Sequence, residues 1–165
     1  MTTRGEVQGA IHLRAVQDIA KSRFGFPTEA NPHLRTYVNH PDKTMGVRLP
    51  TGRPAYPDIV VVEAPENYAA ILGQVETAET VTEERAMKEW LLLADVAPLF
   101  LFVPTGLGDE ALRLARKVKA PIVGLRSWRY AVGYEEIEIT DLFEQPSGPE
   151  DLLPEPLRGI ASKFV

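Results

Sequence analysis

The sequence of 165 residues contains no cysteine. That absence excludes disulfide bonds, thiolate catalysis and every zinc site built with sulfur ligands. The chain also lacks a run of about 18 apolar residues, the length that a membrane-spanning helix needs. Its first ten residues, MTTRGEVQGA, do not form the apolar core of a signal peptide. We therefore expect a soluble, cytoplasmic protein with no membrane segment.

The overall composition is that of an ordinary folded domain. Apolar residues make up 44% of the chain and charged residues 25%, values that differ from those of disordered proteins. The length suits one domain with a hydrophobic core. We expect this domain to span residues 1–145. A proline-rich tail follows at residues 146–165, in which residues 155–162 could form a short helix.

The net charge of −5 argues against strong non-specific binding to nucleic acid. The charge is unevenly distributed, however. Residues 1–56 carry eight Lys and Arg against four Asp and Glu, a net of +4, whereas residues 57–165 carry ten against nineteen, a net of −9. A basic front segment could contact phosphate groups while the acidic remainder faces solvent, but ordinary surface charge explains the same asymmetry.

Hydrophobic periodicity predicts alternating helices and strands along most of the chain. The predicted helices cover residues 8–23, 83–94 and 108–119, and the predicted strands cover residues 35–38, 46–49, 58–63, 70–77, 98–103, 122–125 and 134–139. The β-α-β-α-β order from residue 70 onward, with apolar strands, is typical of a sheet that carries helices on both faces. The expected fold class is therefore α/β.

Two acidic residues lie at the ends of neighbouring predicted strands. Asp58 begins the strand at residues 58–63, and Glu76 lies near the end of the strand at residues 70–77. Alternate residues of a strand share a face, so Gln74 and Glu76 point the same way. If the two strands pair as a hairpin, Asp58 and Glu76 could bind one Mg²⁺ or Mn²⁺ ion, which would activate a water molecule for attack on a phosphoryl group.

These motifs resemble those of a known superfamily. The Pro-Asp pair at residues 57–58, the QVE at residues 74–76 and the helix that follows are similar to the motif of the PD-(D/E)XK nucleases. The stretch QVETAETVTEERAMKEW, followed by LFLFVPTG, also resembles uncharacterised prokaryotic proteins assigned to that fold. The resemblance covers about residues 57–125. It implies a restriction-endonuclease-like mixed sheet flanked by helices, a Mg²⁺ or Mn²⁺ cofactor and nucleic acid as the partner.

The chain departs from the usual superfamily pattern of an acidic residue, a spacer and a lysine, although some restriction enzymes of the superfamily carry an acidic residue in the lysine position. In one alignment Glu76 is the acidic residue and Ala78 occupies the lysine position. In the other, which we prefer because the resembling proteins have Glu-x-Glu here, Gln74 takes the acidic position and Glu76 the lysine position. Lysine is absent from both alignments. Lys88 in the next helix could reach back to replace it, although a solvent-exposed lysine is the more ordinary role.

Two functional hypotheses follow from this pattern. The first is a metal-dependent nuclease with Asp58, Gln74 and Glu76 as the catalytic residues and with Asp58 and Glu76 as the metal ligands. The second is a catalytically inactive nuclease-fold protein that binds nucleic acid or a protein partner. The first requires the two carboxylates to lie close together and open to solvent, and it fails if they point apart or if arginine pairs with each of them. Apolar residues 91–93, LLL, together with the resemblance, make a homodimer plausible.

Two other groups of residues have ordinary interpretations. His12, His33 and His40 are far apart and show no metal-ligand spacing, which favours surface positions or local hydrogen bonds. Residues 126–130, RSWRY, interleave basic and aromatic side chains and could stack on bases or contact phosphates. A partly buried aromatic cluster at the end of the sheet is the alternative.

Overall fold

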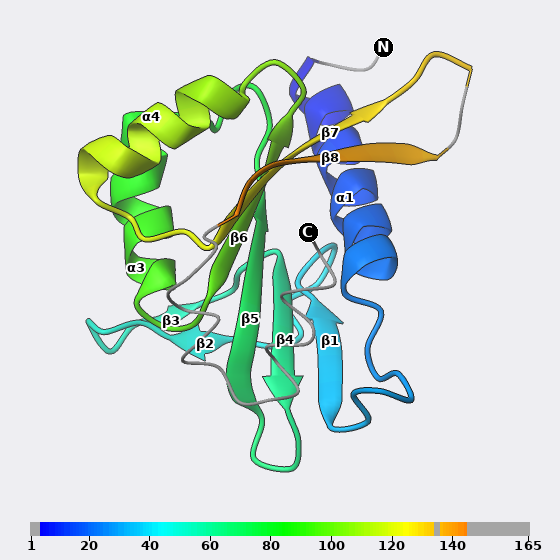
Figure 1. Cartoon of the computed structure of the whole chain (residues 1–165), viewed down its shortest axis with the longest axis vertical. Coiled ribbons are helices and arrows are strands. Elements are labelled where there is room, and N and C mark those ends of the chain that lie inside the picture. Colours follow the sequence, from blue (N-terminus) through cyan, green and yellow to red (C-terminus); the bar gives the residue numbers. More distant parts are fainter. Residues whose placement is uncertain (1–3, 134–135, 145–165) are drawn as a thin grey trace.

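The computed structural model describes residues 4–133 and 136–144 (Figure 1). The helical elements are α1 (Arg4–Arg23), α2 (Glu83–Arg85), the π-helix η1 (Ala86–Trp90), α3 (Leu91–Ala94) and α4 (Gly108–Val118). The strands are β1 (Leu34–Val38), β2 (Val47–Arg48), β3 (Pro54–Ala55), β4 (Ile59–Glu63), β5 (Tyr68–Val75), β6 (Leu99–Pro104), β7 (Gly124–Tyr130) and β8 (Ile137–Glu144).

Six strands form one mixed sheet in the order β1-β4-β5-β6-β7-β8. The β4–β5 pair is an antiparallel hairpin, the pairing on which the metal-site hypothesis was conditional, and the β5–β6 and β6–β7 pairs are parallel. The outer strands β1 and β8 each pair antiparallel with their neighbours. Strands β2 and β3 form a separate small hairpin. The predicted α/β class with a mixed sheet is confirmed.

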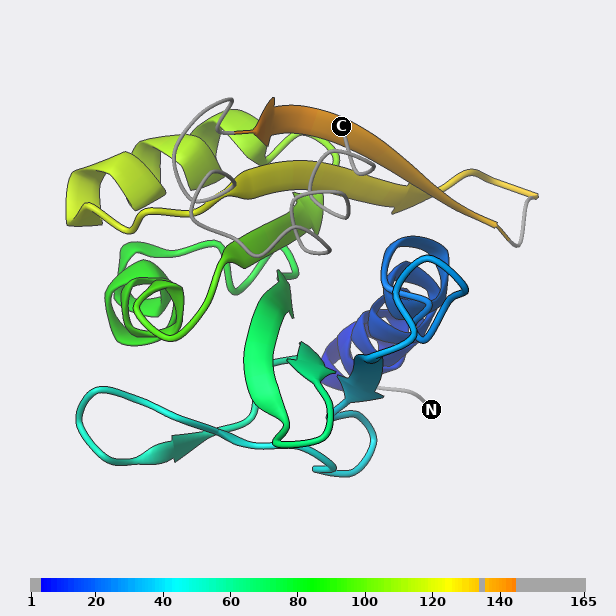
Figure 2. The ribbon, with the colours of Figure 1, turned by 60° about the horizontal axis from the view of Figure 1, so that its bottom comes forward.

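Helices cover both faces of the sheet. Helix α1 lies against one face, and the helical stretch from α2 to α3 lies with α4 against the other (Figure 2). Strand β4 shows why both faces are covered, because Val60 and Val62 pack on the α3–α4 side while Ile59 and Val61 pack on the α1 side. A strand buried on both faces reads as an unbroken apolar run, which is what residues 59–62 show.

Several element boundaries differ from the prediction. Helix α1 begins four residues earlier, at Arg4, and β7 continues to Tyr130 rather than ending at residue 125. Strand β3 was not predicted, because two residues carry no readable periodicity. The strand predicted at residues 134–139 overlaps β8, which spans Ile137–Glu144, and residues 134 and 135 lie outside the described residues. The proline-rich tail at residues 146–165, with its short helix, lies outside the described residues.

The predicted helix at residues 83–94 is present but is irregular. Thr82 caps its first turn, since its hydroxyl oxygen accepts a hydrogen bond from the backbone N–H of Arg85. The middle of the helix is the π-turn η1, in which the N–H of Leu91 bonds to the carbonyl of Ala86. Leu93 is buried in the core, and Leu91 and Leu92 pack partly against it. These leucines are used within the fold, and a homodimer stays a prediction.

The RSWRY segment forms most of β7 and is largely internal. Arg126 is 1% exposed and its Nε lies 2.8 Å from Asp141 on β8. Trp128 is also buried, and the exposed Arg129 bonds to Glu138. These contacts fit the aromatic-cluster interpretation rather than an open surface for nucleic acid.

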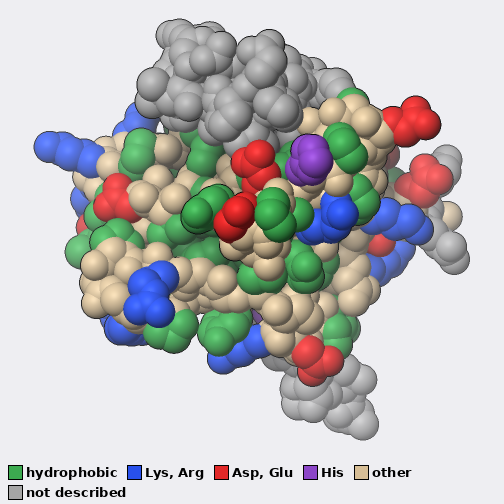
Figure 3. Space-filling view, turned by 90° about the horizontal axis from the view of Figure 1, so that it is seen from below, with side chains coloured by type: hydrophobic (Ala, Val, Ile, Leu, Met, Phe, Trp, Pro, Cys, Tyr) green, Lys and Arg blue, Asp and Glu red, His purple; other side chains and the backbone are tan. Residues whose placement is uncertain are grey.

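At the molecular surface, one end of the protein mixes acidic, basic and apolar side chains without a large region of one charge sign (Figure 3). Within the described ranges, none of the helices combines the length and the apolar character needed to span a bilayer.

Candidate functional site

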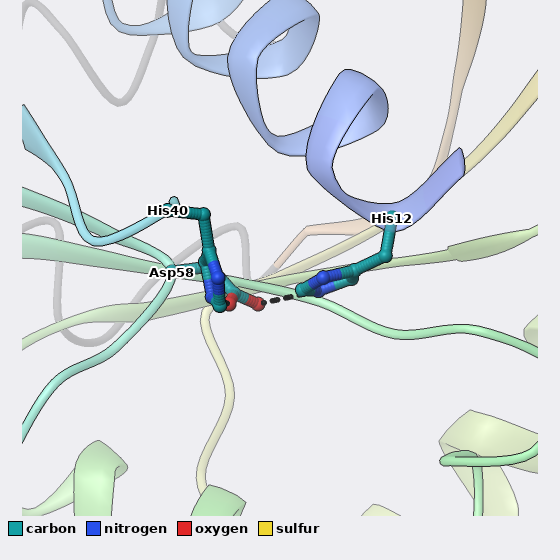
Figure 4. A group of neighbouring side chains, drawn as sticks. All are labelled: His12, His40 and Asp58. Atoms are coloured by element: carbon teal, nitrogen blue, oxygen red, sulfur yellow. Dashed lines mark hydrogen bonds and ion pairs between the residues drawn. The ribbon is translucent and has the colours of Figure 1, made fainter. Parts of the chain in front are cut away.

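Asp58 lies immediately before β4 and is 4% exposed. Its two carboxylate oxygens have different neighbours. Oδ1 lies 2.6 Å from Nε2 of His40, and Oδ2 accepts a hydrogen bond of 2.8 Å from the backbone N–H of Val75. Oδ2 also lies 3.4 Å from Nε2 of His12. Asp58 is therefore surrounded by hydrogen-bonding groups from three separate parts of the chain. Figure 4 shows two of them, His12 and His40, on either side of the carboxylate.

His40 is held in place by the loop that follows β1. The neighbouring Asn39 is 3% exposed, and its amide organises this loop. Its Nδ2 donates to the carbonyls of Met45 and Pro57 at 2.8 and 2.6 Å, and its Oδ1 accepts from the N–H groups of Thr44 and Met45 at 2.7 and 2.9 Å. The loop is thereby tied to the residue before Asp58.

His12 approaches Asp58 from α1. It lies four residues before Val16 and seven before Ile19, both fully buried against the sheet, so the imidazole points toward the end of β5. Its Nε2 lies 2.9 Å from the carbonyl oxygen of Val75. The rings of His12 and His40 contact each other edge to face, with centroids 4.9 Å apart.

The charges in this group stabilise one another. Burial raises the pKa of the Asp58 carboxyl, but hydrogen bonds from His12, His40 and the Val75 amide outweigh burial and lower that pKa to about 2. The hydrogen bond with Asp58 raises the pKa of His12, although burial opposes the shift. Asp58 is consequently ionised across the physiological range.

The three side chains have the chemistry of a metal site. Each of His12, His40 and Asp58 offers one ligand atom, and these atoms lie within 4.8 Å of one another. Two imidazoles with one carboxylate suit Zn²⁺ and other transition-metal ions better than Mg²⁺, which prefers oxygen ligands. Binding an ion through Nε2 of His12 would replace its hydrogen bond to the Val75 carbonyl and release a proton.

Gln74 connects Asp58 to Glu76. Its Oε1 accepts a hydrogen bond of 2.9 Å from the backbone N–H of Asp58, and its Nε2 lies 3.5 Å from Oε1 of Glu76. Gln74 is 3% exposed. The Gln74 amide therefore has a hydrogen-bond partner at each end, and Gln74 and Glu76 point the same way, as strand alternation predicts.

Glu76 is 0% exposed and lies in different surroundings from Asp58. Its Oε1 accepts a hydrogen bond of 3.1 Å from the indole Nε1 of Trp90, and Nε of Arg85 lies 3.3 Å from Oε1 and 3.2 Å from Oε2. Glu76 does not belong to the group of converging ligand atoms. Arginine pairs with Glu76 and histidines pair with Asp58, and both carboxylates are buried rather than open to solvent, as a metal ion shared by the two would require.

A cleft of about 780 Å³ opens beside this group. His12, His40, Asp58 and Gln74 lie on its wall, together with residues of the β2–β3 hairpin and of η1. Four cationic side chains also line it, whereas the carboxylates in its lining belong to Asp58 and Glu89. These cations are Lys43, Arg53, Arg85 and Lys88. The front segment of the chain, which is basic overall, supplies two of the four.

Lys88, the proposed substitute for the missing lysine, lines the cleft but forms an ion pair with Glu84 at 2.8 Å. Its side chain is 72% exposed. It is therefore available to a bound molecule at the rim rather than fixed beside Asp58.

The sequence analysis missed the two histidines. A signal for His12 was present, because it shares the apolar face of α1 with Val16 and Ile19. His40 could have been found only by predicting that β1 pairs with β4 with Val38 opposite Ile59, which brings the residues after β1 next to Asp58. The spacing of residues along the sequence does not predict that long-range strand pairing.

Comparison of the chain with protein-family models, with curated proteins and with the solved structures finds no match. The chemistry of the site is therefore the basis on which a function for this chain can be proposed.

Proposed function

We propose that this protein is a metal-dependent hydrolase that cleaves phosphodiesters in nucleic acid. The observation that carries the proposal is the convergence of His12, His40 and Asp58 on the wall of a cleft lined by four cationic side chains. A divalent ion bound there would lower the pKa of a coordinated water molecule and polarise a phosphoryl oxygen.

The composition of the ligand group supports a transition-metal ion. Asp58 supplies a fixed negative charge that is held by the Val75 amide as well as by the histidines. Three protein ligands leave coordination positions for water and substrate, as catalytic sites require. We expect Zn²⁺ to bind most tightly, Mn²⁺ less tightly and Mg²⁺ weakly.

The charge of the cleft supports an anionic substrate. Its lining carries four cations against two carboxylates, in a chain whose net charge is −5. A local excess of positive charge in an acidic protein attracts phosphate groups to that place rather than to the surface in general. Two of the four cations have carboxylate partners outside the lining, since Arg85 pairs with Glu76 and Lys88 with Glu84, whereas Lys43 and Arg53 belong to the basic front segment.

The pairing of Glu76 with Arg85 favours the second candidate, a protein that binds nucleic acid without cutting it. In this case the cleft would still bind phosphate groups, but the histidine–aspartate group would only stabilise the fold. Metal binding separates the two candidates, because the first requires an ion at Asp58 and the second does not.

The test is calorimetric titration of the native chain with Zn²⁺ and with Mn²⁺. We expect one ion per chain, and a loss of affinity of roughly 100-fold or more in Asp58→Ala and His40→Ala, since even groups that only orient a metal ligand contribute about 10- to 100-fold. His33→Ala is the matched control, because His33 is exposed and lies outside the ligand group, and it should bind as the native chain does.

Cleavage of labelled single-stranded and duplex oligonucleotides completes the test. Activity that requires the metal and disappears in Asp58→Ala and His40→Ala, but persists in His33→Ala, supports the hydrolase. A contaminating nuclease would not follow this pattern. Equal metal affinity in the native chain and Asp58→Ala would contradict the proposal, and oligonucleotide binding without metal binding would support the second candidate.

A further inference from the structure

The buried carboxylate of Glu76 has no part in the proposed metal site, so its contacts require another explanation. It is fully buried, and such a charge is strongly destabilising unless it is paired and hydrogen-bonded. Arg85 supplies the charge partner, and Trp90 and Gln74 supply further hydrogen-bond donors. Three donors converge on this one side chain.

The π-turn η1 makes two of these contacts compatible. Arg85 and Trp90 are five residues apart, which in an α-helix would separate their directions by about 140° around the axis. A π-turn joins residues five apart by its hydrogen bonds and brings them toward the same face. Both side chains therefore reach Glu76, with Trp90 buried in the core and Arg85 at its edge.

Arg85 connects this buried group to the cleft. Its side chain is 32% exposed and forms part of the cleft wall. The contacts with Glu76 are made by Nε. Among the residues that the structure describes, no hydrogen bond engages the two terminal nitrogens of Arg85. A guanidinium fixed through Nε presents those nitrogens as a planar fork, the geometry that binds a phosphate through two parallel hydrogen bonds.

The position of Arg85 is also coupled to the candidate metal ligands. Gln74 bonds to the backbone of Asp58 with one end of its amide and to Glu76 with the other. Asp58 and Arg85 line the same cleft. A phosphate bound by Arg85 would thus be placed at a set position relative to Asp58.

We infer that Arg85 is an anion-binding residue for a phosphate group in the cleft, and that Glu76 is the positioning residue that holds its guanidinium there. The inference rests on the proposed function only in taking that phosphate to belong to the substrate. The anion site itself needs no metal ion.

The experiment uses the full chain with EDTA present and inorganic phosphate as the probe. The ¹H–¹⁵N signal of the Arg85 Nε–H, assigned by its loss in Arg85→Lys, reports on the guanidinium. We expect this signal to be protected from exchange in the native chain and to shift as phosphate is added. Phosphate affinity should fall roughly tenfold in Arg85→Lys, which keeps the charge but loses the fork.

Arg113→Lys is the matched control, because Arg113 pairs with Glu110 on the exposed surface of α4, and its phosphate affinity should equal that of the native chain. Glu76→Gln removes the charge with little change of shape and should abolish the protection of the Arg85 Nε–H. Unchanged phosphate affinity in Arg85→Lys would overturn the anion site. A protected signal in Glu76→Gln would overturn the positioning role.

The outcome is independent of the metal site. Phosphate binding at Arg85 without metal binding at Asp58 would support this inference and contradict the hydrolase. Metal binding at Asp58 with no shift of the Arg85 signal on addition of phosphate would support the hydrolase and contradict the anion site at Arg85.

Discussion

At the scale of single residues, Asp58 joins three segments that are distant in the sequence. His12 comes from α1, His40 from the loop after β1, and the Val75 amide from the end of β5. Each contact is made by a group with few conformational choices, since His40 is held by its loop and the Val75 amide belongs to the sheet. The carboxylate therefore adopts one position in the fold.

Asn39 is the residue whose loss should disturb this arrangement without removing a ligand. We predict that Asn39→Ala lowers the free energy of unfolding by about 2–3 kcal/mol, because the loop loses four hydrogen bonds to a buried amide. Zinc affinity should fall about tenfold, because His40 is no longer fixed. Denaturant unfolding and calorimetry measure the two effects.

Asn31→Ala is the control for that prediction. Asn31 is similarly buried, at 5% exposure, but lies before β1 and away from the ligand group. The Asn31→Ala variant should bind zinc as tightly as the native chain does, even if its free energy of unfolding is lower. Native zinc affinity in Asn39→Ala would show that the loop does not position His40.

At the scale of elements, the π-turn η1 is the irregular feature that shapes the cleft wall. It inserts one residue into an otherwise continuous helical stretch from Glu83 to Ala94. Deleting one residue within it should restore regular α-helix, with Arg85 and Trp90 then four positions apart and still on one face.

We therefore predict that deletion of Met87, which is 52% exposed, changes the free energy of unfolding by no more than about 1–2 kcal/mol. Deletion of Arg113 in the regular helix α4 is the control. It would rotate the following residues by about 100° and turn Leu114 and Ala115 away from the core. Thermal unfolding should show a far larger loss for the second deletion, and equal losses would contradict this account of η1.

At the scale of the whole molecule, the candidate ligands form a site only when the fold is complete. His12 lies on a helix that covers one face of the sheet, and His40 and Asp58 lie at the ends of two neighbouring strands. An ion that binds this group binds the native state and not the unfolded chain, so metal binding and folding are linked.

Zinc should consequently raise the melting temperature. Free Zn²⁺ at about 100 times its Kd should add about 2.7 kcal/mol to the free energy of unfolding, which corresponds to roughly 5–10 °C for a chain of this size. Scanning calorimetry of the native chain and His33→Ala should show the same increase, and His40→Ala should show no more than about 1–2 °C. An equal increase in His40→Ala would place the bound ion elsewhere.

Much of the architecture was predictable because it depends on local patterns. The apolar runs at residues 59–62 and 99–103 identify buried strands wherever they lie in the sheet, and the hairpin of β4 and β5 follows from their short connection. Strand alternation correctly placed Gln74 and Glu76 side by side. The short strand β3 and the true extent of β7 were not predictable, since pairing rather than periodicity defines them.

Local patterns in the chain specify the α/β class, the covering of both sheet faces and the location of Asp58, Gln74 and Glu76 at neighbouring strand ends. These features follow from side-chain periodicity over a few residues. The contacts of Asp58 with two histidines, and of Glu76 with Arg85 and Trp90, arise from packing between distant segments. Those partners depend on the pairing of β1 with β4, the docking of α1 and the π-turn η1, and each is a long-range or irregular feature that local patterns do not encode.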